Sequence, residues 1–295
     1  RWVTVMRGGR TLVTLDPRQT STSELVKLTV GETQQAPAAA PPGAECVRSP
    51  CLLLRGLRSA ESGQPVLDGL SLQVRAGGIY GLAGVGGNGQ EALAQAIMGL
   101  LPLAAGELEL TGAGDLRVLG PEQRRDLGVA VIPADRYGLA LAGGLSVAEN
   151  FGISQVHSGR YGSVWRLDRR AMDEDTVQAV SSFDVLGVTN VRQKAARLSG
   201  GNAQKLVIAR EFSRVPRLVL AHSPSRGLDA RASAQVHSRL RAAREAGAGV
   251  LLISEDLDEV LALADRVGVI VRGRVAVEFA APAQRQEVGK AMVAH

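Results

Sequence analysis

Residues 198–204, Leu-Ser-Gly-Gly-Asn-Ala-Gln, decide the interpretation of this chain. They open a predicted helix over about 199–213, and a short apolar run of the buried-strand type follows at Arg217. That run leads into Pro-Ser-Arg-Gly-Leu-Asp at 224–229, and another strand joins a helix within 251–259. Strands and helices therefore alternate in this half of the chain, which predicts an α/β fold with a mostly parallel sheet.

The same alternation extends toward the N-terminus. Gly-Ile-Tyr-Gly-Leu-Ala-Gly at 78–84 predicts a buried strand that ends in a glycine-rich turn, and a helix over about 90–100 follows. Between these halves, residues 135–197 are more polar and favour helices, with charges of both signs mixed together. We expect them to form a helical insertion.

The turn after the strand at 78–84 continues as Gly-Val-Gly-Gly-Asn-Gly at 84–89, and it fits two motifs. It fits the dinucleotide fingerprint G-x-G-x-x-G, with Glu109 as the acidic residue at the end of a plausible second strand. It also fits the first part of a P-loop, although Gln90 and Glu91 stand where Lys and Ser or Thr are expected. In both cases backbone amides at a helix N-terminus form an anion site.

The order of motifs favours the P-loop interpretation, because it resembles the nucleotide-binding domain of ABC transporters. In that resemblance Leu198–Gly201 is the signature, Ser225–Asp229 the D-loop and Ser254–Asp256 the switch region. The resemblance covers about residues 46–280 and implies an ABC-type P-loop NTPase fold with an antiparallel β subdomain and a helical insertion. Ile132–Arg136 and the Gly-Asn-Gly-Gln loop resemble the second domain of the tandem ATPases that serve simple-sugar and nucleoside importers.

The resemblance also implies a domain organisation. Residues 1–33 are similar to the tail of a preceding ABC domain, since the stretch from Arg1 can be laid over the stretch from Arg266 with one gap. The Pro- and Ala-rich residues 34–50 have linker composition. We expect the ABC domain at 51–280, its helical subdomain at about 135–197, and a C-terminal tail at 281–295.

The resemblance places nucleotide binding at Gly84, Gly86, Gly87, Asn88, Gly89, Gln90 and Glu91. Hydrolysis, however, needs neutralised phosphates, a held Mg²⁺ and an oriented water. Gln90 replaces the P-loop Lys, His222 and Ser223 replace the Asp-Glu pair after the strand at 217, and Glu255 replaces the switch His. Ala134 occupies the Q-loop position. We predict no metal ligands and no hydrolysis at this loop.

The signature positions match the family and are Leu198, Ser199, Gly200, Gly201, Asn202 and Gln204, with Asp229 in the D-loop. In the family, two domains pair head to tail, so each signature closes on the partner's P-loop. The resemblance therefore implies that this chain donates its signature to an intact first ABC domain, which binds ATP and Mg²⁺. Arg136 is expected either to touch a membrane subunit or to be an ordinary surface residue.

The family further implies permease subunits as partners, a substrate-binding protein as an indirect one, and a peripheral position on the cytoplasmic face of the membrane. Aromatic residues make up only 3% of the 295 residues and the charge of +5 is scattered, which argues against a nucleic-acid partner. Three alternatives remain: a dinucleotide-binding oxidoreductase, a soluble ABC ATPase outside transport, and a purely regulatory ABC domain.

Overall fold

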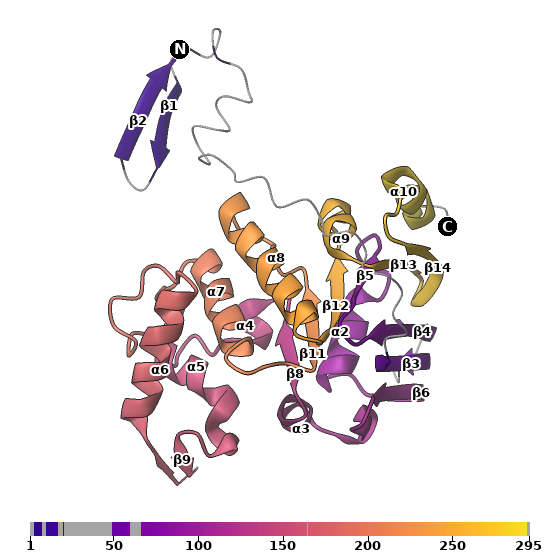
Figure 1. The fold of residues 1–295 in the computed structure, drawn as a ribbon, viewed down its shortest axis with the longest axis horizontal. Helices are drawn as coiled ribbons and strands as arrows, with labels where there is room; N and C mark the ends of the chain where they lie inside the picture. The colour runs from indigo at the N-terminus through magenta and orange to yellow at the C-terminus, as the bar shows by residue number, and fades with distance from the viewer. Residues whose placement is uncertain are drawn as a thin grey trace.

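The predicted buried strands form one six-stranded sheet (Figure 1). The computed structural model describes residues 3–7, 10–16, 20, 49–59, 66–163 and 165–293. Five strands run parallel in the order β13 (Arg266–Val271), β5 (Ile79–Ala83), β12 (Gly249–Ser254), β11 (Leu218–His222) and β8 (Val129–Ile132). Strand β14 (Arg274–Ala280) pairs antiparallel with β13 at the edge. The strands predicted at 78–84, after Arg217 and within 251–259 are confirmed as β5, β11 and β12.

Alternating side chains on these strands fill two separate cores. On β11, Leu218 and Leu220 pack in the core that contains helix α2 (Gln90–Met98), whereas Val219 and Ala221 pack in the other core. That second core also holds the apolar faces of α8 (Ala230–Glu245), α9 (Leu257–Leu263) and α10 (Arg285–Val293). Burial on both faces explains why these strands are apolar at nearly every position.

A second, antiparallel sheet covers the α2 side of the first (Figure 1). Its order is β4 (Asp68–Arg75), β3 (Pro50–Ser59), β6 (Leu103–Leu110) and β7 (Gly114–Asp115). Glu109 lies on β6 of this sheet, opposite Leu53 and Asp115. The dinucleotide hypothesis required Glu109 on a neighbouring parallel strand, so the structure does not favour it.

The remaining helices lie mainly between β8 and β11 in the chain. They are α3 (Pro121–Asp126), α4 (Arg136–Leu139), α5 (Val147–Gly152), α6 (Arg169–Ser182) and α7 (Gly200–Glu211). The 3-10 turns Leu116–Val118, Ile153–Ser158 and Ala195–Arg197 and the hairpin β9 (Gly162–Ser163)–β10 (Arg166–Leu167) connect them. Val147 and Phe151 of α5 and Leu206 of α7 share a small core of their own. No helix in the part of the chain described here has the length and apolarity to cross a membrane.

The N-terminal hairpin has the same pairing pattern as the C-terminal one. Strands β1 (Val3–Arg7) and β2 (Arg10–Leu15) pair antiparallel, as β13 and β14 do. In each hairpin the register shifts after a Val–Val pair, Val5 with Val13 in one and Val269 with Val277 in the other. The last pairs are Arg7 with Arg10 and Val271 with Arg274, so the paired residues of the two hairpins correspond without the gap that the sequence comparison required. Apart from Ser49 and Pro50, the predicted linker 34–50 lies outside the described residues.

Candidate nucleotide-binding site

The glycine loop lies between the carboxyl end of β5 and the N-terminus of α2, as predicted. Because β5, β12 and β11 are parallel neighbours, the residues that follow them gather at the same edge of the sheet. Glycine is needed at two places: Gly89 has φ 109°, and a Cβ on Gly84 would lie 2.6 Å from the Ile270 side chain. Larger residues would therefore not fit at these two positions of the loop.

The side chain of Gln90 is folded back into this loop. Its Oε1 accepts a hydrogen bond of 3.0 Å from the Asn88 backbone N–H, and its Nε2 donates one of 3.0 Å to the Val85 carbonyl. Only 5% of Gln90 is exposed. A backbone N–H that an anion could use is thus already bonded to the uncharged side chain of Gln90, which stands at the position predicted for the P-loop Lys.

Two carboxylates lie at this edge. Oε2 of Glu91 lies 3.5 Å from Nδ1 of His222, and a Cβ on Gly86 would lie 2.8 Å from Oε1 of Glu255. Burial is the largest influence on the pKa of His222 and lowers it; Glu91 and Glu255 raise it, Arg226 lowers it, and the net shift is downward. His222 therefore does not offset the charge of the two carboxylates near pH 7, and their charge beside the loop disfavours a phosphate chain.

The position after β11 and the surrounding residues supply no ligands for Mg²⁺ among the described residues. Ser223, which follows β11, has a left-handed backbone (φ 47°) and donates its N–H to the Ile253 carbonyl over 2.7 Å. Among the described residues, no group of three or more His, Cys, Asp and Glu side chains could hold a metal ion. The described residues at this loop do not fit Mg²⁺-ATP, because Gln90 brings no charge and the carboxylates of Glu91 and Glu255 would repel the phosphates.

The N-terminus of α7, in the signature region, is exposed, whereas the glycine loop is filled by its own side chain. Ser199 is the N-cap of α7, and Ser199 and Gly200 are both exposed. The Ser199 hydroxyl makes no capping bond to its own helix; it accepts 2.9 Å from the Asn202 amide. The first backbone N–H groups of a helix have no partner within the helix, so this exposed terminus offers donors to an anion.

The other predicted residues of this region hold the loops together. The Oδ1 atom of Asn202 accepts from the Leu186 N–H, and buried Gln204 donates 3.0 Å to the Pro224 carbonyl. Asp229 caps α8 by accepting 2.7 Å from the Ala232 N–H. Leu198 is buried in the small core shared with α5. Gln204 therefore connects the signature helix to Pro224, the residue directly before the predicted D-loop.

Arg136 is tied to the signature in a way that the sequence did not reveal. Its guanidinium donates to the Gly200 carbonyl over 2.6 Å and to the Arg226 carbonyl over 3.3 Å. Next to it, the Tyr137 hydroxyl donates 3.0 Å to the Leu198 carbonyl. Backbone carbonyls as partners leave no sequence pattern, which is why neither expectation for Arg136 foresaw these bonds.

Glu259 forms a second connection that the sequence did not reveal. It is buried, accepts 2.6 Å from the Ser254 hydroxyl and lies 3.0 Å from Nε2 of His237. Burial alone would raise the pKa of Glu259, but the bonds from His237, Ser225 and Ser254 together lower it. This carboxylate therefore links α8, α9 and the end of β12 beneath the site.

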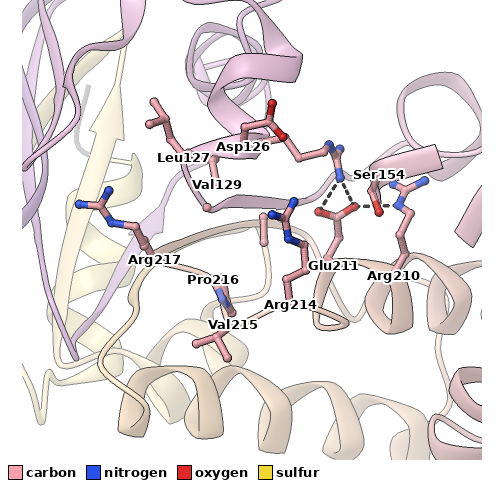
Figure 2. Close-up of a pocket in the computed structure, with 13 residues that line it drawn as sticks. Asp126, Leu127, Val129, Ser154, Arg210, Glu211, Arg214, Val215, Pro216 and Arg217 are labelled. Atoms are coloured by element: carbon pink, nitrogen blue, oxygen red, sulfur yellow. Dashed lines mark hydrogen bonds and ion pairs between the residues drawn. The ribbon is translucent and has the colours of Figure 1, made fainter. Parts of the chain in front are cut away.

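The far end of α7 is anchored by a buried ion network (Figure 2). Glu211 accepts from Nη1 of Arg125 at 2.9 Å, from Nε of Arg210 at 2.8 Å and from the Val131 N–H at 3.0 Å. Burial alone would raise its pKa, but the two arginines hold it below the usual value. A cavity of about 220 Å³ opens beside this network, where Arg214 and Arg217 also lie.

The fold and the loop define an α/β P-loop-type nucleotide-binding domain. Comparison with known protein families matches residues 67–226 to the ABC transporter family. The chain belongs to the ABC transporter family.

Three similar proteins are named as import ATP-binding proteins. The chain is 37% identical over 297 residues to a glucose import ATP-binding protein of Haloferax volcanii, covering 98% of this chain and 53% of that protein. It is 37% identical over 276 residues to a guanosine import ATP-binding protein of Bacillus subtilis, covering 92% and 53%. A ribose import ATP-binding protein of Rubrobacter xylanophilus is 36% identical, with 97% and 55% covered. The chain thus spans about half the length of these relatives.

Solved structures show the same fold. A structure titled as the ATP-binding subunit of an ABC transporter has a TM-score of 0.66 and 24% identity, covering 81% of this chain and 93% of that one. A dimeric ATP-binding cassette bound to ADP and Pi has a TM-score of 0.67 and 19% identity, covering 79% and 99%. At this identity the likeness establishes the ABC ATPase fold, which confirms the predicted fold class.

Proposed function

We propose that this chain is the catalytically degenerate second half of the ATP-binding protein of an ABC importer for nucleosides or simple sugars. In this role it binds ATP weakly or not at all at its own loop. It donates Ser199–Gly201 to the P-loop of an intact first ABC domain, where ATP and Mg²⁺ bind. Permease subunits are the direct membrane partners, a substrate-binding protein is an indirect one, and the assembly lies on the cytoplasmic face of the membrane.

One observation carries the proposal: the glycine loop of this chain is filled by its own side chain, whereas its signature helix has an exposed N-terminus. The glycine loop is filled by Gln90 and flanked by the carboxylates of Glu91 and Glu255. The signature terminus is exposed, with Ser199 and Gly200 accessible. This contrast supports a domain that binds nucleotide poorly at its own loop and acts through its signature, which requires a partner domain.

The domain organisation supports the same proposal. The β1–β2 hairpin repeats the pairing of β13–β14, as the end of a preceding ABC domain would. The relatives are importer proteins about twice as long as the region that matches. Two of these relatives are named for the import of a sugar and one for the import of a nucleoside, so the proposal includes both substrate classes.

The test measures ATP binding and turnover by this chain alone and after mixing with an intact ABC first half. We expect no turnover by the chain alone and turnover when the first half is present. Mg²⁺-dependent turnover by the chain alone would contradict the degenerate assignment. Failure to stimulate the first half would instead favour a purely regulatory domain.

A further inference from the structure

The segment that enters the helical region makes three side-chain bonds to two other motifs. Asp135 caps α4 by accepting from the N–H groups of Tyr137 and Gly138, at 3.1 and 2.9 Å. This cap fixes the start of the helix from which Arg136 and Tyr137 project. Arg136 reaches Gly200 and Arg226, and Tyr137 reaches Leu198.

These bonds hold a part of the chain that has little side-chain packing of its own. Gly200 and Gly201 have no side chains, and Ser199 is exposed. A Cβ on Gly201 would lie 3.5 Å from Leu228, and one on Gly227 would lie 3.4 Å from the Arg136 guanidinium. The signature turn and the segment before Asp229 therefore approach each other at Gly201 and Gly227. Because glycines have no side chains to pack, hydrogen bonds must hold these two segments in place.

Arginine suits this task. Its guanidinium is planar, always charged and presents donors in a fixed fork, so one side chain can bridge two carbonyls. The structure gives Arg136 two carbonyl partners and no carboxylate partner within the described residues. Its position is thus set by the two loops that it joins.

We infer that Arg136, assisted by Tyr137, is a positioning residue that fixes the signature terminus relative to the D-loop segment. Through these bonds, a movement of residues 135–137 would be transmitted to Ser199–Gly201. The effect on turnover rests on the proposed donation of the signature in trans, whereas the effect on local rigidity does not.

The first test is amide hydrogen exchange on the 295-residue chain. Arg136→Gln should speed exchange about tenfold in peptides covering 198–204 and 226–230, because the lost bonds stabilise those segments. Tyr137→Phe should give a smaller increase confined to the signature peptide. Arg170→Gln is the matched control: it removes an exposed arginine of the same helical region whose partner is Glu174. Unchanged exchange in the signature peptide of both Arg136→Gln and Tyr137→Phe would overturn the inference.

The second test measures ATP turnover when each variant is paired with the intact first half. Arg136→Gln should raise the KM for ATP and lower kcat, and Arg136→Lys should recover part of the loss, since it keeps one donor group. Faster exchange with unchanged KM and kcat would overturn the functional part of the inference.

Ser199→Arg separates the two proposals. If Ser199→Arg leaves turnover unchanged, the trans-donation proposal fails, while hydrogen exchange still judges the role of Arg136. If Ser199→Arg abolishes turnover but Arg136→Gln changes neither exchange nor turnover, the role of Arg136 fails alone.

Discussion

The glycine loop and the signature terminus are both helix N-termini at which backbone N–H groups can meet a phosphate, yet they have diverged. At the loop, Gln90 takes up the Asn88 N–H and the nearby His222 is neutral. At the signature, the Ser199 hydroxyl leaves the helix N–H groups uncapped, and the terminus is exposed. A helix N-terminus is thus closed by its own chain in one place and open in the other, and the two caps also differ in backbone, left-handed at Gly89 and extended at Ser199.

The largest effect is expected at the anchor of the signature helix. Glu211→Gln would leave Arg210, which is 4% exposed, without its buried carboxylate partner. Removing one member of a buried ion pair costs about 3–5 kcal/mol. Urea unfolding followed by circular dichroism should therefore show a lower midpoint with an unchanged slope.

Glu174→Gln serves as the control for this prediction. It removes a carboxylate that is 65% exposed and paired with Arg170, so the midpoint should hardly change. Equal midpoints for Glu211→Gln and the unmodified chain would show that α7 is not anchored through this network.

The next effect compares the two termini directly. In the two-domain protein, Ser199→Arg should reduce ATP turnover about 100-fold, because a bulky side chain obstructs donors that act on the partner's phosphates. Gln90→Ala, at the closed loop of the same chain, should change turnover less than about twofold. Similar losses in the two variants, measured as phosphate release, would remove the functional difference between the termini.

The sequence predicted the parts of this comparison that follow from local patterns. The apolar runs located β5, β11 and β12, and the order of motifs located the glycine loop and the signature helix. The absence of a Lys at Gln90 could be read directly. The sequence could not predict contacts between residues far apart in the chain. These are the hydrogen bonds of Arg136 to backbone carbonyls and the contact of buried Glu259 with His237. These depend on which loops the tertiary fold brings together. The roles of the site residues themselves stay predictions.

A smaller effect concerns the charge beside the loop. Glu255→Gln should raise the affinity of the chain for ATP about fivefold, since a unit charge at about 4 Å in a water-exposed site contributes about 1 kcal/mol. Binding of a fluorescent ATP analogue at low ionic strength is the measurement, because salt screens exposed charges. Glu245→Gln, which removes an exposed carboxylate at the C-terminal end of α8, is the control and should change nothing. If the two variants bind alike, Glu255 is not what repels nucleotide.

The smallest effect is a pH dependence that only the closed loop should show. Because burial lowers the pKa of His222 in the folded chain, the unfolded chain takes up a proton first as the pH falls through about 6.5. The free energy of unfolding should therefore decrease as the pH falls from 7.5 through 6.5 toward the lower, folded-state pKa of His222, and then level off as far as this group is concerned. Replacing His222 by Asn, which does not titrate, should remove that part of the decrease, whereas His157→Asn should not, since His157 is mostly exposed beside Glu122. Urea unfolding at pH 7.5, 6.5 and 5.5 measures this difference. An equal acid sensitivity in the His222→Asn chain would mean that the pKa of His222 is the same in the folded and unfolded chains. Burial would then not disfavour protonation of His222, and below about pH 6.5 the loop would gain a positive charge beside Glu91 and Glu255, which would weaken its contrast with the signature terminus.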